Sequence, residues 1–301
     1  MRILSFQPTS TEMVFALGKG RSIVGVSHEC TYPPAARRKP VVSTCVFDPE
    51  KLSSREIDRA VVAAAREGES LYRLDEDLVR RLKPDLLLTQ SLCEVCAVSP
   101  SDFGRVLRLV EPRPRVLSLH AHDLEGMFSD LAELAGVLGV DPAPLAARLR
   151  RRIDRVVSKV RGLPRPRIFC MEWLDPVYAS GHWVPELVAL AGGVDGLARP
   201  GEPSRAIEWS QVVEAAPEVL VLMPCGFSLK RAKREWTALR KRPGWAKLPA
   251  VREGRVYLAD GPAYFNGAGP RLVDGLEILS EILHPEVFRA PRRPGYTRVR
   301  S

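Results

Sequence analysis

The stretch Glu76–Gln90, EDLVRRLKPDLLLTQ, decides the fold, because a helical pattern passes within it into a strand pattern. Apolar residues recur at helical spacing as far as Leu82, and the run Leu86–Leu88 that follows Pro84 is apolar without interruption. A short continuous apolar run is typical of a strand that is buried on both faces, as in a parallel sheet. The stretch therefore predicts a helix followed by a strand of an α/β sheet.

The same alternation of helices and strands recurs in both halves of the chain. Further strands are expected at residues 2–6, 23–27, 115–119, 167–173, 219–226 and 255–260. Between the halves, residues 123–139 and 144–162 carry apolar residues at helical spacing. We therefore expect two Rossmann-like α/β lobes joined by a long backbone helix. The expected segments are an N-terminal lobe (1–122), connecting helices (123–163), a C-terminal lobe (164–288) and a basic tail (289–301).

Composition and charge exclude several classes of protein. The 301 residues contain 45 Lys and Arg against 36 Asp and Glu, a net charge of +9. The basic residues are scattered without an aromatic-interleaved patch, so no nucleic-acid partner is expected. No apolar run approaches the roughly 18 residues of a membrane span, so none is expected. The chain opens directly on a strand pattern without a secretory signal, so we expect a cytoplasmic protein whose six cysteines are reduced thiols.

Residues with reactive or aromatic side chains collect just after the expected strands. In open α/β sheets, ligands bind beyond the carboxyl ends of the strands, so these residues are the candidates for a binding site. In the first half they are His28, Glu29, Cys30, Cys93, Glu94 and Cys96, and in the second half Trp173, His182, Trp183, Cys225, Tyr264, Phe265 and Arg271.

The pair Cys93 and Cys96 has three possible roles. One C-x-x-C pair is half of a zinc or iron site, which Cys30 and His28 would complete. The pair would otherwise be a redox couple or two small apolar side chains that pack a turn. A buried unpaired carboxylate is costly, so Glu94 should reach solvent or pair with a donor such as Arg271 or His28.

The remaining candidates also have a functional and a structural interpretation. Glu29 or His28 would act as a general base beside an activated thiol, or His28 would make an ordinary structural hydrogen bond. Trp173 and Trp183 would stack on a planar ring or seal a hydrophobic edge, and His182 would be an axial cobalt ligand. Cys225 would face the ligand or lie buried. Arg271 would bind an anionic group or form an ion pair with Asp274 or Glu277, one helical turn away.

Four stretches, LSFQPTSTEMVFALG (4–18), LKPDLLLTQ (82–90), GGVDGLARPGEPSRAIEWSQVVEAAPEVLVL (192–222) and GRVYLADG (254–261), resemble the cobalamin-binding branch of the class III, helical-backbone substrate-binding proteins. The motifs SHEC, CEVC, GHW and PCGF are similar to a cytoplasmic subgroup. The resemblance implies a ligand cleft between the lobes for a small molecule. That ligand would be a corrinoid such as cobalamin, or another metal-bearing compound. The alternative is a metal- or thiol-dependent enzyme that uses the Cys/His/Glu cluster in the same cleft.

One departure from the family pattern concerns docking to an ABC permease. The resemblance implies a surface carboxylate on each lobe. Asp77 supplies it on the first lobe, whereas Ser210 stands at the second position and Glu208 is shifted by two residues. The sequence therefore argues against permease docking.

Overall fold

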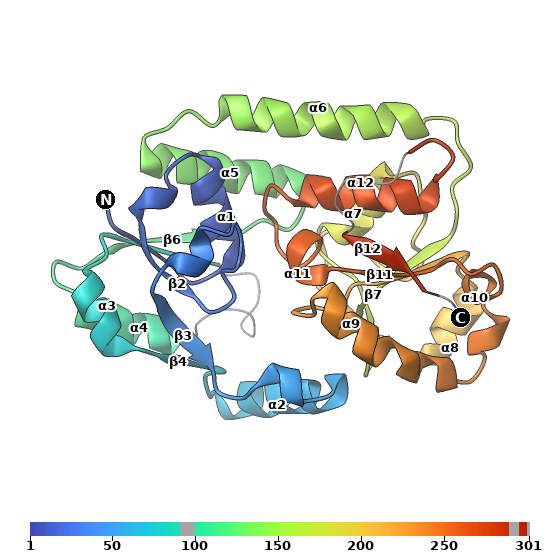
Figure 1. The fold of residues 1–301 in the computed structure, drawn as a ribbon, viewed down its shortest axis with the longest axis horizontal. Coiled ribbons are helices and arrows are strands. Elements are labelled where there is room, and N and C mark those ends of the chain that lie inside the picture. The colour runs from blue at the N-terminus through green and yellow to red at the C-terminus, as the bar shows by residue number, and fades with distance from the viewer. Residues whose placement is uncertain (91–99, 289–294, 300–301) are drawn as a thin grey trace. The chain divides into compact units, whose positions relative to one another are not determined.

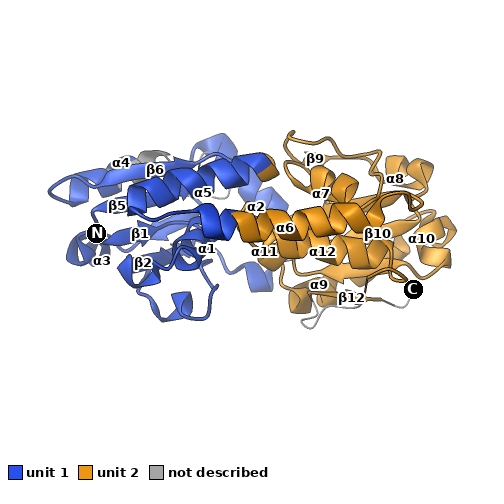
Figure 2. Cartoon of the chain, turned by 90° about the horizontal axis from the view of Figure 1, so that it is seen from above, with its two compact units in different colours: residues 1–52, 56–121, 125–146 blue, residues 53–55, 122–124, 147–301 orange. Residues whose placement is uncertain are grey.

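The computed structural model describes residues 1–90, 100–288 and 295–299, which form two units (Figures 1 and 2). Unit 1 comprises Met1–Leu52, Glu56–Ala121 and Glu125–Ala146, and unit 2 comprises Ser53–Arg55, His122–Leu124 and Ala147–Ser301. The 18-residue helix α6 (Ala143–Val160) begins in unit 1 and continues into unit 2. The prediction of two α/β lobes joined by a long helix is therefore confirmed, while the finer segment boundaries stay predictions.

Unit 1 contains a six-stranded sheet in the order β4-β3-β2-β1-β5-β6. Strands β3, β2, β1, β5 and β6 run parallel to one another, and β4 is antiparallel to β3. Its strands are β1 (Ile3–Ser5), β2 (Ile23–Ser27), β3 (Val41–Cys45), β4 (Tyr72–Leu74), β5 (Leu86–Gln90) and β6 (Arg115–Leu119). The helices before α6 are α1 (Pro8–Ala16), α2 (Ser54–Glu67), α3 (Glu76–Leu82), α4 (Pro100–Leu109) and α5 (Leu124–Leu138), with 3-10 turns η1 (Gly20–Ser22), η2 (Ala36–Arg38) and η3 (Pro49–Lys51).

The stretch that decides the fold behaves as its pattern predicts. Asp75 caps α3 by accepting a hydrogen bond from the Leu78 amide, and the helix ends at Lys83, whose φ of 41° is the left-handed conformation common at helix ends. Pro84 cannot continue the helix, and β5 then pairs in parallel with β1 and β6. Leu87 packs with Leu4 against α3 and α4, whereas Leu86 and Leu88 are equally buried on the opposite face.

Unit 2 contains a six-stranded mixed sheet in the order β12-β11-β10-β7-β8-β9, in which β11, β10 and β7 are parallel and the outer pairs are antiparallel. Its strands are β7 (Ile168–Trp173), β8 (Tyr178–Ala179), β9 (Arg205–Ala206), β10 (Val219–Leu222), β11 (Val256–Ala259) and β12 (Tyr296–Arg298). Its helices are α7 (Val184–Leu190), α8 (Trp209–Ala215), α9 (Leu229–Glu235), α10 (Pro249–Arg252), α11 (Gly261–Tyr264) and α12 (Leu272–Leu283), with 3-10 turns η4 (Trp236–Lys241) and η5 (Trp245–Lys247).

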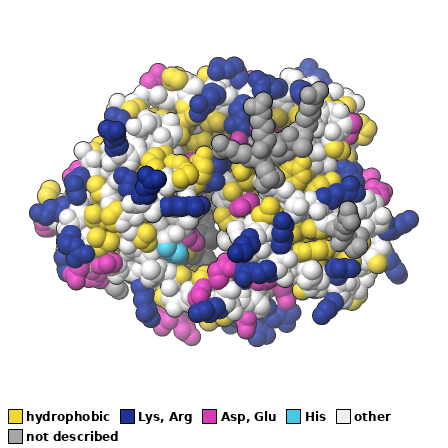
Figure 3. Space-filling view, viewed as in Figure 1, with side chains coloured by type: hydrophobic (Ala, Val, Ile, Leu, Met, Phe, Trp, Pro, Cys, Tyr) yellow, Lys and Arg dark blue, Asp and Glu magenta, His cyan; other side chains and the backbone are white. Residues whose placement is uncertain are grey.

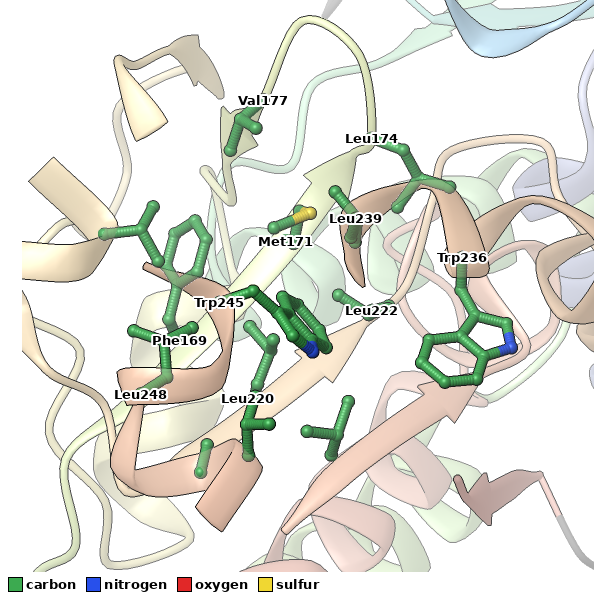
Figure 4. Packing of buried hydrophobic residues seen from close by; sticks show 14 of the residues in the cluster. Phe169, Met171, Leu174, Val177, Leu220, Leu222, Trp236, Leu239, Trp245 and Leu248 are labelled. Atoms are coloured by element: carbon green, nitrogen blue, oxygen red, sulfur yellow. The ribbon is translucent and has the colours of Figure 1, made fainter. Parts of the chain in front are cut away.

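The core of unit 2 follows the two-residue period of its strands. Phe169 and Met171 of β7 and Leu220 and Leu222 of β10 point to the same face, where they pack around Trp245 (Figure 4). Burying each such side chain stabilises the fold by roughly 1.5–3 kcal/mol. The rigid sheet that results positions the residues at the carboxyl ends of β7, β10 and β11.

One ion-pair cluster joins α6 to α12 within unit 2. The guanidinium of Arg152 donates hydrogen bonds to both carboxylate oxygens of Glu277, at 2.9 and 2.6 Å, and a further one to Asp274. These carboxylates raise the pKa of Arg152. The sequence had offered Asp274 and Glu277 as partners of Arg271, but the structure pairs both with Arg152.

Two expectations concern a nucleic-acid partner and a membrane span. On the face shown in Figure 3, Lys and Arg side chains are spread over the surface rather than gathered in one patch. Among the described residues, no helix is both long enough and apolar enough to cross a membrane.

Candidate functional site

The carboxyl ends of β1 and β2 in unit 1 carry a buried network of hydroxyl and thiol groups. Thr11 Oγ1 donates to Ser5 Oγ at 2.9 Å and lies 3.1 Å from Cys30 Sγ, which Ser27 Oγ also contacts at 3.1 Å. Ser10 Oγ lies 2.7 Å from Ser5 Oγ. Ser5, Ser10 and Thr11 of this network lie in the stretch SFQPTST, which starts at the last residue of β1 and was not among the expected site residues.

Cys30 is a buried member of this network, with 3% of its surface exposed. Burial raises the pKa of its thiol, and the hydrogen bonds from Ser27 and Thr11 offset only part of that effect. A reactive cysteine needs a lowered pKa and access to its partner. Burial and the raised pKa therefore give no support to Cys30 as an activated thiol beside His28 and Glu29.

His28 and Glu29 follow the same strand. The His28 ring is half-buried, lies 5.6 Å from the ring of Tyr72, and has a buried Nδ1 atom without a hydrogen-bond partner among the described residues. Burial lowers the pKa of His28. Desolvation by the surrounding protein raises the pKa of the Glu29 carboxyl to about 7. The side chain is nevertheless exposed, so we expect solvent to screen much of that shift.

The expected CEVC site cannot be placed, because Cys93, Glu94 and Cys96 lie outside the described residues. The described residues contain no group of three or more His, Cys, Asp and Glu side chains arranged to hold a metal ion. The zinc or iron site on Cys30, His28, Cys93 and Cys96 stays a prediction, as does the expected pairing of Glu94 with Arg271 or His28.

Unit 2 displays aromatic groups at the corresponding edge of its sheet. Trp173 ends β7, Cys225 follows β10 and Tyr264 follows β11, and all three side chains are half-buried. Because β7, β10 and β11 are adjacent and parallel, their carboxyl ends meet at one edge. The Trp173 ring lies 5.0 Å from the ring of Phe227, and its Nε1 donates a 3.2 Å hydrogen bond to the Ser54 carbonyl. We call the Trp173 ring, together with the Phe227 ring that it contacts, the aromatic edge.

Trp183 and Phe265 do not belong to that edge. They are only 5% and 1% exposed, and Trp183 Nε1 donates a 2.7 Å hydrogen bond to the Phe265 carbonyl. The Phe265 ring packs against Gly275 of α12, where an added Cβ would lie 3.1 Å from it. Both rings therefore pack in the interior of unit 2, and their contact with a ligand stays a prediction. Arg271 is half-buried just before α12, and no ligand role for it follows from its position.

His182 sits at a tightly constrained corner between β8 and α7. Its amide donates a 2.6 Å hydrogen bond to the Glu202 carbonyl, and its own carbonyl accepts one from Gly201 at 2.9 Å. Its φ of 52° is left-handed, and unlike Lys83 and Ala216 it does not end a helix. Such strain is concentrated at functional sites in proteins.

A second histidine stands beside this corner. The rings of His122 and His182 have centroids 5.7 Å apart, and His182 Nδ1 is buried without a hydrogen-bond partner among the described residues. Burial, and to a lesser extent His122, lowers the pKa of His182. His122 was not among the expected site residues. Its position three residues after the end of β6 could have marked it as a candidate.

The chain matches one model of a protein family over most of its length. The model named "Periplasmic binding protein" matches residues 3–263. The chain belongs to this family. The substrate-binding class inferred from the sequence is thus confirmed, while the cytoplasmic subgroup with its CEVC motif stays a prediction.

Curated relatives match nearly the whole length of the chain. An uncharacterized ABC transporter substrate-binding lipoprotein, YvrC, of Bacillus subtilis is 24% identical over 96% of this chain and 81% of its own length. A vitamin B12-binding protein of Vibrio cholerae is 22% identical over 92% of this chain and 86% of its own.

Solved structures share the fold. A periplasmic heme-binding protein from Pseudomonas aeruginosa superposes with a TM-score of 0.72 at 24% identity, covering 100% of this chain and 99% of that one. The periplasmic vitamin B12-binding protein BtuF of Vibrio cholerae superposes with a TM-score of 0.66 at 21% identity, covering 94% and 96%.

Proposed function

We propose that this protein binds a planar, metal-bearing small molecule, with a corrinoid such as cobalamin as the first candidate and heme as the second. The proposal draws on relatives named as vitamin B12-binding proteins and on a structural neighbour named as a heme-binding protein. Both ligands present a large flat ring system around a metal. A protein that holds either needs an apolar, aromatic surface of matching flatness.

The aromatic edge of unit 2 is the observation that carries the proposal. Trp173 is held by its hydrogen bond to Ser54 and by its contact with Phe227, yet part of its ring remains exposed. A rigid aromatic ring loses little conformational entropy when a flat ligand stacks on it. Each Å² of apolar surface that the ligand covers contributes roughly 25 cal/mol.

The enzymatic alternative has less support. It requires an activated thiol or a metal cluster, and the Cys30 thiol is buried, hydrogen-bonded and shifted to a higher pKa. The described residues offer no cluster of three metal-ligating side chains in its place.

Titration with hydroxocobalamin and with hemin tests the proposal. We expect the absorption bands of at least one ligand to shift on binding, with heat released or absorbed in calorimetry. Trp173→Ala should weaken that binding at least tenfold, about 1.4 kcal/mol, whereas Trp173→Phe keeps a flat ring and should lose less. Absence of binding by the unmodified protein would exclude both ligands. Unchanged affinity of Trp173→Ala would move the site away from the aromatic edge.

Delivery to an ABC permease follows from the same proposal. The name of the Bacillus subtilis relative weighs against the sequence-based argument that docking is absent. Asp77 on unit 1 is exposed and pairs with Arg80 at 2.9 Å. On unit 2, Glu208 is exposed just before α8, and its amide donates a 3.0 Å hydrogen bond to Gln211 Oε1. The cytoplasmic location expected from the sequence stays a prediction, which cell fractionation would test.

A further inference from the structure

We propose that Ser54, Glu235 and Arg231 are positioning residues of the aromatic edge, which hold the Trp173 ring in a fixed orientation for a flat ligand. The inference rests on the proposed function for the contact between Trp173 and a ligand, but the order of the ring itself can be measured without one. The three residues act through Trp173 and need not touch the ligand themselves.

The first residue of α2 connects Trp173 to a carboxylate on α9. The Ser54 carbonyl accepts the 3.2 Å hydrogen bond from Trp173 Nε1. The amide and the hydroxyl of Ser54 both donate to Glu235 Oε2, at 3.1 and 2.6 Å. Ser54 is only 3% exposed, so water competes little for these bonds. The residue whose carbonyl holds the indole is therefore itself fixed by two hydrogen bonds.

A buried guanidinium holds the other oxygen of the same carboxylate. Arg231 is 3% exposed and donates to Glu235 Oε1 from Nε at 2.9 Å and from Nη2 at 2.6 Å. The two residues lie one helical turn apart in α9. A buried charge is strongly destabilising when its partner is removed, so each member of this pair keeps the other in place.

The same guanidinium also contacts the aromatic edge. The central carbon of the Arg231 guanidinium lies 4.4 Å from the centroid of the Phe227 ring, which is a cation–π contact. Phe227 in turn lies 5.0 Å from the Trp173 ring. The contacts thus form a closed circuit, which runs from Trp173 through Ser54, Glu235, Arg231 and Phe227 back to Trp173. The circuit restrains the indole at its nitrogen through Ser54 and at its ring through Phe227.

The turn that carries Ser54 has a second attachment to unit 2. Arg55 donates to both carboxylate oxygens of Asp175, at 2.8 and 3.0 Å, and Asp175 lies two residues after Trp173. Residues 53–55 belong to unit 2, whereas the chain before them and the rest of α2 belong to unit 1. The order of Trp173 therefore depends on a short segment 119 residues earlier in the chain.

A purely structural role would also account for these contacts, since they fasten the start of α2. The two explanations differ in their consequences for the Trp173 ring. If the network positions the ring, breaking it should free the ring and weaken ligand binding only where Trp173 is present. If the network is only structural, breaking it should lower the stability of the protein without a specific effect on Trp173.

Quenching of tryptophan fluorescence by acrylamide measures the freedom of the ring without a ligand. The chain has five tryptophans, so the signal of Trp173 is the difference between each protein and its Trp173→Phe counterpart. Glu235→Gln replaces one acceptor oxygen by a donor, which must face the donors of Ser54 or those of Arg231. We expect the quenching of the half-buried Trp173 to rise about twofold, because more of the ring becomes accessible.

Two further variants complete this measurement. Ser54→Ala removes only the hydroxyl and leaves the pair of Arg231 and Glu235 intact. It should raise the quenching by a smaller amount, and it decides the question if Glu235→Gln fails to fold. Glu76→Gln is the matched control, because it breaks an Arg–Glu pair of the same spacing in α3, and it should leave the quenching of Trp173 unchanged. Unchanged quenching in the folded network variants would overturn the proposal.

Titration with hydroxocobalamin and hemin provides the second measurement. For a ligand that binds, Glu235→Gln should weaken the affinity about fivefold, because the freed indole must be ordered again on binding. In a Trp173→Ala background the same substitution should leave the affinity unchanged. Equal weakening in both backgrounds would assign the network to general stability and overturn the proposal. If neither ligand binds the unmodified protein, the proposed function fails, and the quenching of Trp173 alone decides whether the network positions the ring.

Discussion

The hydroxyl oxygen of Thr11 lies 3.1 Å from the sulfur of Cys30, a contact that joins the first turns of α1 to the end of β2. Thr11 is fully buried, and Ser27 contacts the same sulfur from the other side. The thiol thus serves as a hydrogen-bonding group inside unit 1. Its role is to hold a helix start against a strand end, at the edge where the sheet presents His28.

Removing this thiol should destabilise unit 1. Cys30→Ala leaves the buried hydroxyls of Thr11 and Ser27 with one partner fewer, and an unsatisfied buried polar group costs about 1–3 kcal/mol. The free energy of unfolding from urea denaturation measures the effect. Cys225→Ala, at a half-buried thiol, is the matched control and should change the free energy by less than about 0.5 kcal/mol. Equal effects of the two substitutions would show that the network contributes nothing.

The sequence predicted the fold well because local patterns encode it. The Pro84 break and the apolar run after it fix α3 and β5, and the alternation of such units fixes a parallel sheet. The candidate site was predicted less well. Trp173 and Cys225 were expected just after strands, and both lie at the edge of the sheet. The same rule did not distinguish them from Trp183 and Phe265, which are buried.

The failures have a common physical cause. Whether an aromatic ring faces solvent depends on which helix covers it, and Phe265 is covered by α12, whose packing no local pattern specifies. The contact of His122 with His182 joins segments 60 residues apart, and the partners of Asp274 and Glu277 come from α6, more than 120 residues earlier. Spacing along the chain predicts neighbours within one helix and misses such long-range pairs.

Arg152→Met should destabilise unit 2. The substitution keeps the aliphatic stem of the side chain and leaves the like charges of Asp274 and Glu277 on the same helix without their shared partner. Because Arg152 is largely covered, we expect a loss of about 1–2 kcal/mol in the free energy of unfolding. Arg199→Met removes an exposed guanidinium 3.5 Å from Glu202 and should have almost no effect. A negligible effect of Arg152→Met would show that the cluster is fully screened by solvent.

Gly181→Ala should disturb the corner that holds His182. An added Cβ would lie 2.2 Å from the Ser204 amide nitrogen and 2.5 Å from the Pro203 carbonyl carbon, and backbone atoms cannot move aside cheaply. We expect a loss of about 1–3 kcal/mol in the free energy of unfolding. Gly136→Ala in α5 is the control, because no atom lies within 4 Å of its new Cβ and alanine favours a helix. It should stabilise the protein by about 0.5–1 kcal/mol. Stabilisation by both substitutions would mean that the backbone of residues 202–204 moves aside without a cost in stability.

Acidification should unfold the protein partly through His28 and His182. Burial is the largest cause of the lowered pKa of each ring, so below the unfolded-state value of 6.5 the unfolded chain binds protons that the folded chain excludes. The stability that the neutral rings contribute is complete above pH 6.5 and is lost as the pH falls through their folded pKa values. Glu281, whose pKa burial raises to about 7, acts in the opposite direction, so the comparison of variants is the informative measurement.

The test compares urea denaturation at pH 7.5 and pH 5.5. The double variant His28→Gln with His182→Asn should lose less free energy of unfolding between the two pH values than the unmodified protein, because it lacks the two imidazoles whose pKa burial lowers. If the double variant is as sensitive to acid as the unmodified protein, the two rings are hydrated in solution, and the buried, unpaired nitrogen of His182 is not a feature of the folded protein in water.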